Sequence, residues 1–145
     1  MPDIESALSD TGVIASLSAF IREFGGGGHE PVSVVVQSRC ATCYGTTFWM
    51  QCSEEEGVAN RTCTECKRAV FIGDSDEHWD AADVGDATCP CGKKVFHLGV
   101  GYCLTESGEV AWMIVGAACV ACSAEGVYAD WSIDYEPSKQ LLDMA

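Results

Sequence analysis

The chain has 145 residues and a mass of 15.4 kDa, which suffices for one compact domain or two very small ones. Hydrophobic residues make up 48% of it, which excludes disorder throughout, and the longest apolar run, Val110 to Val120, is too short to span a bilayer. With 8 Lys and Arg against 22 Asp and Glu, the formal net charge is −14, which disfavours nucleic acid as a partner because phosphates would repel the chain.

The N-terminal segment, residues 1–24, is predicted to contain a helix over residues 10–24. Its apolar residues follow the 3-4-3 spacing of one helix face: Ile14, Leu17, Ile21 and Phe24. Residues 25–31 include four consecutive glycines and are interpreted as a flexible linker. The first ten residues contain acids where a signal peptide would have Lys or Arg, so we expect no export and a cytoplasmic location.

Residues 32–73 and 89–136 are predicted to form two β-rich units. In the first unit we expect strands in PVSVVVQS, TTFWMQC and AVFI, and we interpret SEEEGVANR as a solvated turn. In the second unit, VFHLGVGYCL and VAWMIVGAAC flank the hairpin loop TESGE, and GVYADWSID forms a further strand. An acidic linker, residues 74–88, separates the units, and a tail over residues 137–145 has a predicted turn anchored by Leu141 and Leu142.

The ten cysteines hold most of the functional information. Eight of them form four close pairs, in CATC, CTEC, CPC and CVAC. Two neighbouring thiols on a tight turn point at one spot, which favours a metal ion over disulfides to distant partners, as does a reducing compartment. Taken in order, the pairs give two sets of metal ligands: Cys40, Cys43, Cys63 and Cys66, then Cys89, Cys91, Cys119 and Cys122.

The two sets differ in how closely they follow a known spacing. The first fits the four-thiolate zinc pattern, whereas the second has a one-residue spacer, so Cys103 or His97 could replace one of its ligands. Combining cysteine pairs in chain order closes shorter loops and is favoured. A cross-braced arrangement, in which Cys40 and Cys43 share a metal with Cys89 and Cys91, stays open. Cys52 and Cys103 lie in apolar stretches and are expected in the core. We expect two zinc ions per chain, with iron less favoured.

Each unit resembles a zinc ribbon, in which two cysteine-bearing β-knuckles hold a small antiparallel sheet. The resemblance covers residues 38–72 and 87–134 and rests on the cysteine pairs and on Phe48 and Phe96, which follow them at equal spacing and indicate a duplication. It implies a small, mainly β fold of two zinc-ribbon units, each with a three-stranded antiparallel sheet, plus the N-terminal helix. It implies zinc but no activity. Rubredoxin-like domains share the knuckle and bind iron, and CPCG resembles that knuckle with one residue missing.

Most basic residues of the chain lie beside proposed ligands. They are Arg39, Arg61, Lys67, Arg68, Lys93 and Lys94. We interpret them as compensation for the negative charge of zinc with four thiolates, rather than as a phosphate-binding patch. Two complete four-thiolate sets leave no open metal position for catalysis, and the common hydrolase and nucleotide-binding motifs are absent, so we expect no enzymatic activity.

The acidic linker is the candidate partner surface. Trp79 is surrounded there by acids without basic neighbours: Asp76, Glu77, Asp80 and Asp83. Aromatic anchors ringed by charge are common interface hot spots, but a solvated linker that Trp79 merely attaches to a ribbon is an equal alternative. The leading hypothesis is a zinc-stabilised adaptor, inhibitor or immunity-type protein that binds a basic protein. The alternatives are a transcription- or translation-associated ribbon contacting nucleic acid or polymerase, and a thiol redox or metal-handling protein.

Overall fold

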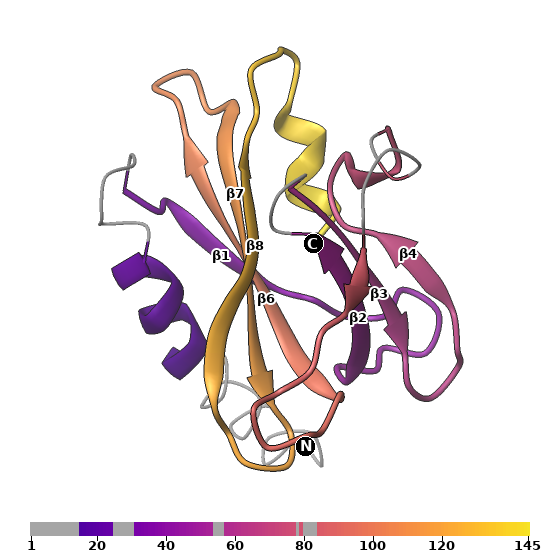
Figure 1. The fold of residues 1–145 in the computed structure, drawn as a ribbon. Coiled ribbons are helices and arrows are strands. Elements are labelled where there is room, and N and C mark those ends of the chain that lie inside the picture. Colours follow the sequence, from indigo (N-terminus) through magenta and orange to yellow (C-terminus); the bar gives the residue numbers. More distant parts are fainter. Residues whose placement is uncertain (1–14, 25–30, 54–56, 78, 80–83) are drawn as a thin grey trace, which may run out of the picture.

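The computed structural model describes residues 15–24, 31–53, 57–77, 79 and 84–145. One helix spans residues 15–24, and the short 3-10 helices η1 (Ser75–Glu77) and η3 (Lys139–Asp143) lie farther along the chain. The strands of the described part are β1 (Val34–Gln37), β2 (Phe48–Ser53), β3 (Val58–Cys63), β4 (Ala69–Phe71), β5 (Gly85–Asp86), β6 (Phe96–Leu104), β7 (Val110–Cys119) and β8 (Glu125–Ser132). The prediction of a small, mainly β protein with an N-terminal helix is confirmed (Figure 1).

The strands form one antiparallel sheet in the order β4-β3-β2-β6-β7-β8. Each predicted unit supplies three neighbouring strands of this sheet, and the two halves join where Phe48 of β2 pairs with Phe96 of β6. These are the two aromatic residues that follow the cysteine pairs at equal spacing. Because β2 and β3 also contact β8, the sheet curls around a shared core. Its largest fully buried side chains include Tyr102, Phe48, Phe96, Met50, Leu98 and Met113.

Strand β1 differs from the expectation. It was expected in the first unit, yet it pairs antiparallel with β6 of the second, from Val34 opposite Tyr102 to Gln37 opposite Gly99. Strand β6 is nine residues long and pairs with β2 at Phe96 alone, so the rest of that edge is free to bind β1. The chain therefore crosses from the sheet of the second unit directly into the first cysteine pair.

The expectation of a solvated turn over SEEEGVANR is wrong for its second half, which forms β3. Residues 54–56 lie outside the described part of the chain. The side chains of β3 alternate in burial, with Asn60 and Thr62 on the outer face and Arg61 and Cys63 on the inner face. The strand was missed because its outward residues are polar and one of its inward residues is an arginine.

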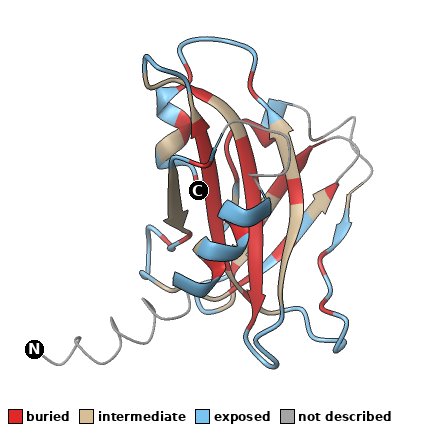
Figure 2. Ribbon diagram, turned by 90° about the vertical axis from the view of Figure 1, so that its left-hand side faces the viewer, coloured by how far each residue is buried: buried red, intermediate tan, exposed pale blue. Residues whose placement is uncertain are grey.

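The helix over residues 15–24 packs on the second unit. Leu17 and Ile21 are fully buried against β6 and β7, and the outer face of the helix is exposed (Figure 2). Glycines make this approach possible, because a Cβ at Gly101 or Gly116 would lie 2.5 or 2.6 Å from side-chain atoms of Ile21. Phe24, predicted on the packing face, is instead 41% exposed. The predicted residues 10–14 of the helix and most of the glycine linker lie outside the described residues.

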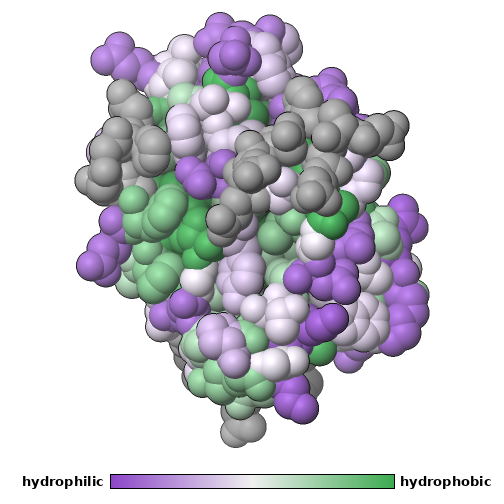
Figure 3. Space-filling view, in the orientation of Figure 1, coloured by the Kyte–Doolittle hydropathy of each residue, from purple (hydrophilic) through white to green (hydrophobic). Residues whose placement is uncertain are grey.

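The side of the molecule on which the helix lies carries a gathering of hydrophobic surface beside hydrophilic groups (Figure 3). Phe20 joins Phe24 among the exposed large hydrophobic residues of the helix. Among the described residues, no helix has the length and apolar character needed to cross a membrane.

The C-terminal tail closes one end of the core. The predicted turn is confirmed as η3, in which Leu141 is 2% exposed and Leu142 packs against the core. The Tyr102 hydroxyl donates a hydrogen bond of 2.7 Å to the Leu141 carbonyl, and the Gly73 N–H donates one of 2.8 Å to Met144. Since Gly73 belongs to the first unit and Tyr102 to the second, the tail holds the two units together.

Candidate metal centres

The eight predicted ligands gather in two groups of four. Within each group all four Sγ atoms lie within 4.8 Å of one another. In the first group, the Sγ atoms of Cys40 and Cys66 are 3.4 Å apart and those of Cys43 and Cys63 are 3.5 Å apart. The second group holds Cys89, Cys91, Cys119 and Cys122. The pairing is sequential, so the cross-braced alternative is excluded.

The geometry of both groups fits a tetrahedral metal ion. A zinc ion with Zn–S bonds of about 2.3 Å places its sulfur atoms about 3.8 Å apart. In the second group the Sγ atoms are 3.5 Å apart for Cys89 and Cys122 and 3.7 Å apart for Cys91 and Cys119. A disulfide would require about 2.05 Å, so these thiols are not bonded to one another. Four soft thiolates are a donor set compatible with zinc, and each group can hold one ion.

The local backbone explains why each cysteine pair converges. In three knuckles the residue after the second cysteine donates its N–H to the carbonyl of the first, at 2.8–3.0 Å. These residues, Tyr44, Lys67 and Ser123, all have a φ of 63–66°, which non-glycine residues seldom adopt. The CPC knuckle is the same turn with one residue removed, because Gly92, with φ 93°, donates to the Cys89 carbonyl at 2.8 Å.

Backbone N–H groups also tune the thiols. The N–H groups of Cys43 and Thr42 lower the pKa of Cys40 to about 6. The corresponding N–H groups of Cys122 and Ala121 lower the pKa of Cys119 to about 7. A thiol with a lowered pKa is prepared to bind a metal as thiolate.

The first cysteine of the short CPC knuckle, Cys89, is the exception, because its pKa is raised whereas the pKa of the first cysteine in each other knuckle is lowered. The Cys91 N–H lowers the pKa of Cys89, but burial and the neighbouring thiols outweigh that single backbone donor and raise it to about 12. Removing one residue from the knuckle thus removes one N–H donor from the first cysteine.

One basic side chain, Arg61, reaches the first group from inside the protein. It projects inward from β3, is 9% exposed, and lies with its guanidinium 4.7 Å from the centre of the Phe48 ring. Burial lowers the pKa of Arg61, and the thiolate charges of Cys40 and Cys63 oppose that effect. Its Nε donates to the Ala145 carbonyl at 3.0 Å. The electrostatic interaction of Arg61 with Cys40 and Cys63 supports charge compensation as its role.

The other basic residues near the cysteines are exposed: Arg39, Lys67, Arg68, Lys93 and Lys94. Lys67 places its Nζ 4.6 Å from the centre of the Trp49 ring, and Lys94 pairs with Asp86 at 3.5 Å. Trp49 is 37% exposed because it projects from the outer face of β2.

Neither alternative ligand of the second group takes part. The Nδ1 of His97 lies 3.0 Å from the Thr46 carbonyl oxygen, outside the group. Cys103 is fully buried on the face of the sheet that the helix covers, as expected for a core residue. Cys52, also expected in the core, is half-buried and packs against it.

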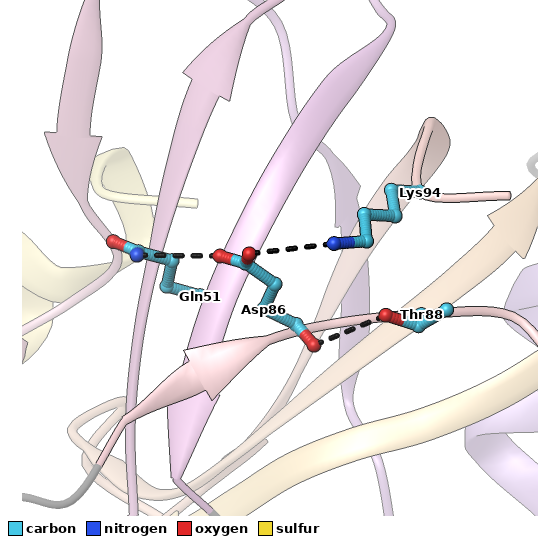
Figure 4. A network of polar contacts seen from close by, with 4 residues as sticks. All are labelled: Gln51, Asp86, Thr88 and Lys94. Carbon is cyan, nitrogen blue, oxygen red and sulfur yellow. Dashed lines mark hydrogen bonds and ion pairs between the residues drawn. The ribbon is translucent and has the colours of Figure 1, made fainter.

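The acidic linker, residues 74–88, is held against the first unit near its C-terminal end. Its end forms β5, which pairs with β2. Asp86 accepts a hydrogen bond from Gln51 at 3.3 Å and pairs with Lys94, and its carbonyl accepts one from Thr88 (Figure 4). These contacts connect the first unit to the residues of the CPC knuckle region that precede β6.

The predicted partner residues are only partly placed. Asp76 and Glu77 are exposed on η1, whereas Asp80 and Asp83 lie outside the described residues. Trp79 is half-buried, with its ring edge-on to Phe71 of β4 at 5.2 Å. This contact attaches the segment to the first unit, and Trp79 stays partly accessible.

Sequence reasoning missed one buried acid. Asp74 is 8% exposed and accepts hydrogen bonds from the Trp131 indole at 3.2 Å and the Tyr135 hydroxyl at 2.9 Å. These residues lie 57 and 61 positions from Asp74 along the chain, so no local motif marks the contact.

Comparison of the chain with protein-family models, curated proteins and solved structures found no match. The assignment of the two metal centres therefore depends on their geometry and donor atoms.

Proposed function

We propose that the protein is a non-enzymatic, zinc-stabilised acidic module that binds a basic protein partner, as an adaptor, inhibitor or immunity-type protein does. The proposal depends on one contrast. Each metal centre has a complete set of four ligands, whereas one carboxylate among the described residues, that of Asp86, has an ion-pair partner within 4.0 Å. Each centre has four thiolates, which leaves a tetrahedral ion no position for substrate or water. Chemistry at the metal is therefore disfavoured, and a structural role for zinc is favoured.

The surface charge supports the choice of a basic partner. The chain has 14 more acids than bases, and within the described residues one ion pair, Lys94 with Asp86, lies within 4.0 Å. Arg61, one of the eight bases, is buried beside the first metal centre. Unpaired carboxylates on a surface accelerate association with a positively charged protein.

The test uses affinity capture from the source cells, followed by binding measurements on the purified partner at low and moderate ionic strength. Two variants probe the acidic linker: Trp79→Ala, and a fourfold variant with Asp76→Asn, Glu77→Gln, Asp80→Asn and Asp83→Asn. We expect binding to weaken by about tenfold in each, through faster dissociation for Trp79 and slower, salt-sensitive association for the acids.

A matched variant changes four acids elsewhere that are exposed or half-buried: Glu23→Gln, Glu106→Gln, Glu125→Gln and Asp143→Asn. It has the same net charge as the linker variant, so it separates a local surface from a general charge effect. Both must retain their metals. If the captured partner is acidic, or if binding is insensitive to ionic strength, the proposal is wrong. If the two fourfold variants lose affinity equally, the linker is not the interface.

A second candidate function, contact with nucleic acid, is favoured by one local feature. Trp49 is 37% exposed on the outer face of β2 with the Lys67 ammonium 4.6 Å from its ring centre. An exposed aromatic ring beside a cation is typical of single-strand binding surfaces. Salt-sensitive binding of a labelled oligonucleotide that Trp49→Ala abolishes would support this function over the first.

A further inference from the structure

A cavity of about 370 Å³ lies where β3, η1 and the end of β8 meet. Among the residues that the structure describes, its lining consists of Gly57, Asp74, Glu77, Trp131, Ser132, Asp134 and Tyr135. The wall holds three carboxylates and two aromatic rings, and none of the eight Lys and Arg residues lines it. Its volume lies within the range of ordinary ligand pockets.

The carboxylate of Asp74 is held in a fixed position in this wall. It is 8% exposed and accepts two hydrogen bonds from neutral donors, one from the Trp131 indole and one from the Tyr135 hydroxyl. No cation lies within 4.0 Å of it among the described residues. A buried carboxylate is ordinarily paired with a cation, because removing its charge from water is costly. A cationic ligand in the cavity would supply the missing charge.

A close contact between two chain segments shapes the cavity, and its acids give it a negative electrostatic potential. Gly57, with φ 64°, permits the close approach of the chain to Trp131, because a Cβ there would lie 2.6 Å from the Trp131 Cβ. The pKa of Tyr135 is raised by burial, by its hydrogen bond to Asp74 and by the charges of Asp74, Glu77 and Asp134. The same field that opposes a phenolate stabilises a cation in this cavity.

A second cavity, of about 390 Å³, adjoins the first across Asp134 and Tyr135. Its other lining residues include Glu109 and Glu136, and again no Lys or Arg lines it. The carboxylate of Glu109 is already bound by the N–H groups of Ser138 and Lys139. The carboxylates therefore extend beyond one cavity, as expected for a segment that presents more than one cationic side chain.

We propose that the cavity formed by Asp74, Glu77, Trp131, Asp134 and Tyr135 binds the ammonium or guanidinium group of a lysine or arginine side chain from a basic segment of a partner protein. This inference depends on the proposed function and gives it a site distinct from Trp79. The acids supply the charge, and the aromatic rings supply apolar contact for the methylene groups of the bound side chain.

The experiment titrates the full-length, metal-loaded protein with capped tripeptides that differ in one side chain: Gly-Lys-Gly, Gly-Arg-Gly and Gly-norleucine-Gly. The readout is the resonance of the Trp131 indole N–H, which is bonded to Asp74. We expect the lysine and arginine peptides to shift this resonance in a saturable manner, and the neutral norleucine peptide to leave it in place.

Two variants test the assignment of residues. Glu77→Gln with Asp134→Asn removes two exposed carboxylates of the cavity, and its matched control, Glu23→Gln with Glu106→Gln, removes two exposed carboxylates elsewhere. We expect the first to weaken binding of the lysine peptide by about fivefold and the control to leave it unchanged. Asp74→Asn should abolish the preference for lysine over norleucine, whereas a purely structural role would lower stability and preserve that preference.

Several outcomes would overturn the inference: equal shifts with norleucine, equal affinity in the Glu77/Asp134 variant and the parent, or no shift with any peptide. If butylammonium binds and the capped lysine peptide does not, the site takes a free amine, and the assignment to a partner side chain is wrong. A captured basic partner that binds the Glu77/Asp134 variant normally would refute the cavity and leave the proposed function standing. If the peptides bind in the cavity but affinity capture recovers no basic protein, the cavity stands and the proposed function is wrong.

Discussion

The two metal centres share one architecture but differ in their surroundings. The first has two four-residue knuckles and the buried Arg61 beside Cys40 and Cys63. The second has one shortened knuckle, and the lysines that follow it, Lys93 and Lys94, are exposed. The cysteines thus define where a metal binds, whereas the neighbouring backbone and charges determine how firmly the thiolates are held.

The difference between the centres shows how two similar units can differ in sequence while keeping the same sulfur geometry. Sulfur separations are 3.4–3.5 Å in the first centre and 3.5–3.7 Å in the second, despite the missing residue. The CPC turn compensates by using a glycine, Gly92, where the other knuckles use Tyr44, Lys67 or Ser123 at positive φ. The thiolates of the second centre lack the internal cation, and Cys89 has one backbone donor fewer than Cys40.

The largest expected effect comes from removing a buried ligand. Cys63 is fully buried in the shared core, and Cys63→Ser should cost the first metal and unfold the protein, because structural zinc contributes about 10–16 kcal/mol in small domains and total stabilities are about 5–15 kcal/mol. Cys122→Ser changes an exposed ligand and should leave a folded protein with weaker metal binding. Circular dichroism and native mass spectrometry would measure both variants.

Cys103→Ala is the matched control, since Cys103 is buried but lies outside both groups. It should retain two metals. A folded Cys63→Ser variant with two metals would show that the first group is not a metal centre.

The next effect isolates the internal cation. Arg61→Met keeps the volume of the side chain but leaves the thiolates of the first centre without their buried positive charge. We expect a loss of about 3 kcal/mol in the free energy of unfolding, and faster transfer of the first metal to a chelator. Lys94→Met removes an exposed cation near the second centre and should cost less than about 1 kcal/mol. Equal losses in the two variants would remove the distinction between the centres.

A smaller effect should be confined to the helix that covers the second unit. In Gly101→Ala, the added Cβ would lie 2.5 Å from the Ile21 Cγ2, so the helix must shift away from the sheet. We expect a loss of about 1–3 kcal/mol in the free energy of unfolding, with both metals retained. Urea denaturation and elemental analysis would check this expectation. Loss of either metal would show that the helix supports the metal centres directly.

The metal centres could be predicted from the sequence because their information is local. Each cysteine pair occupies one turn, and only the combination of pairs required the fold. The pairing of β1 with the second unit could not be predicted, since its partner β6 lies more than 60 positions away in the sequence. Strand β3 was missed because Arg61, which is normally a surface residue, faces inward beside thiolates. The cavity around Asp74 was missed for the same reason as β1, because it assembles from three distant segments.

Metal stoichiometry tests the central claim most directly. Elemental analysis combined with native mass spectrometry of the purified protein should find two zinc ions per chain, and removal of both by a strong chelator at neutral pH should abolish the β-sheet signal in circular dichroism. One metal per chain, or a sheet that persists after both metals are removed, would contradict the account of two zinc-dependent units that share one core.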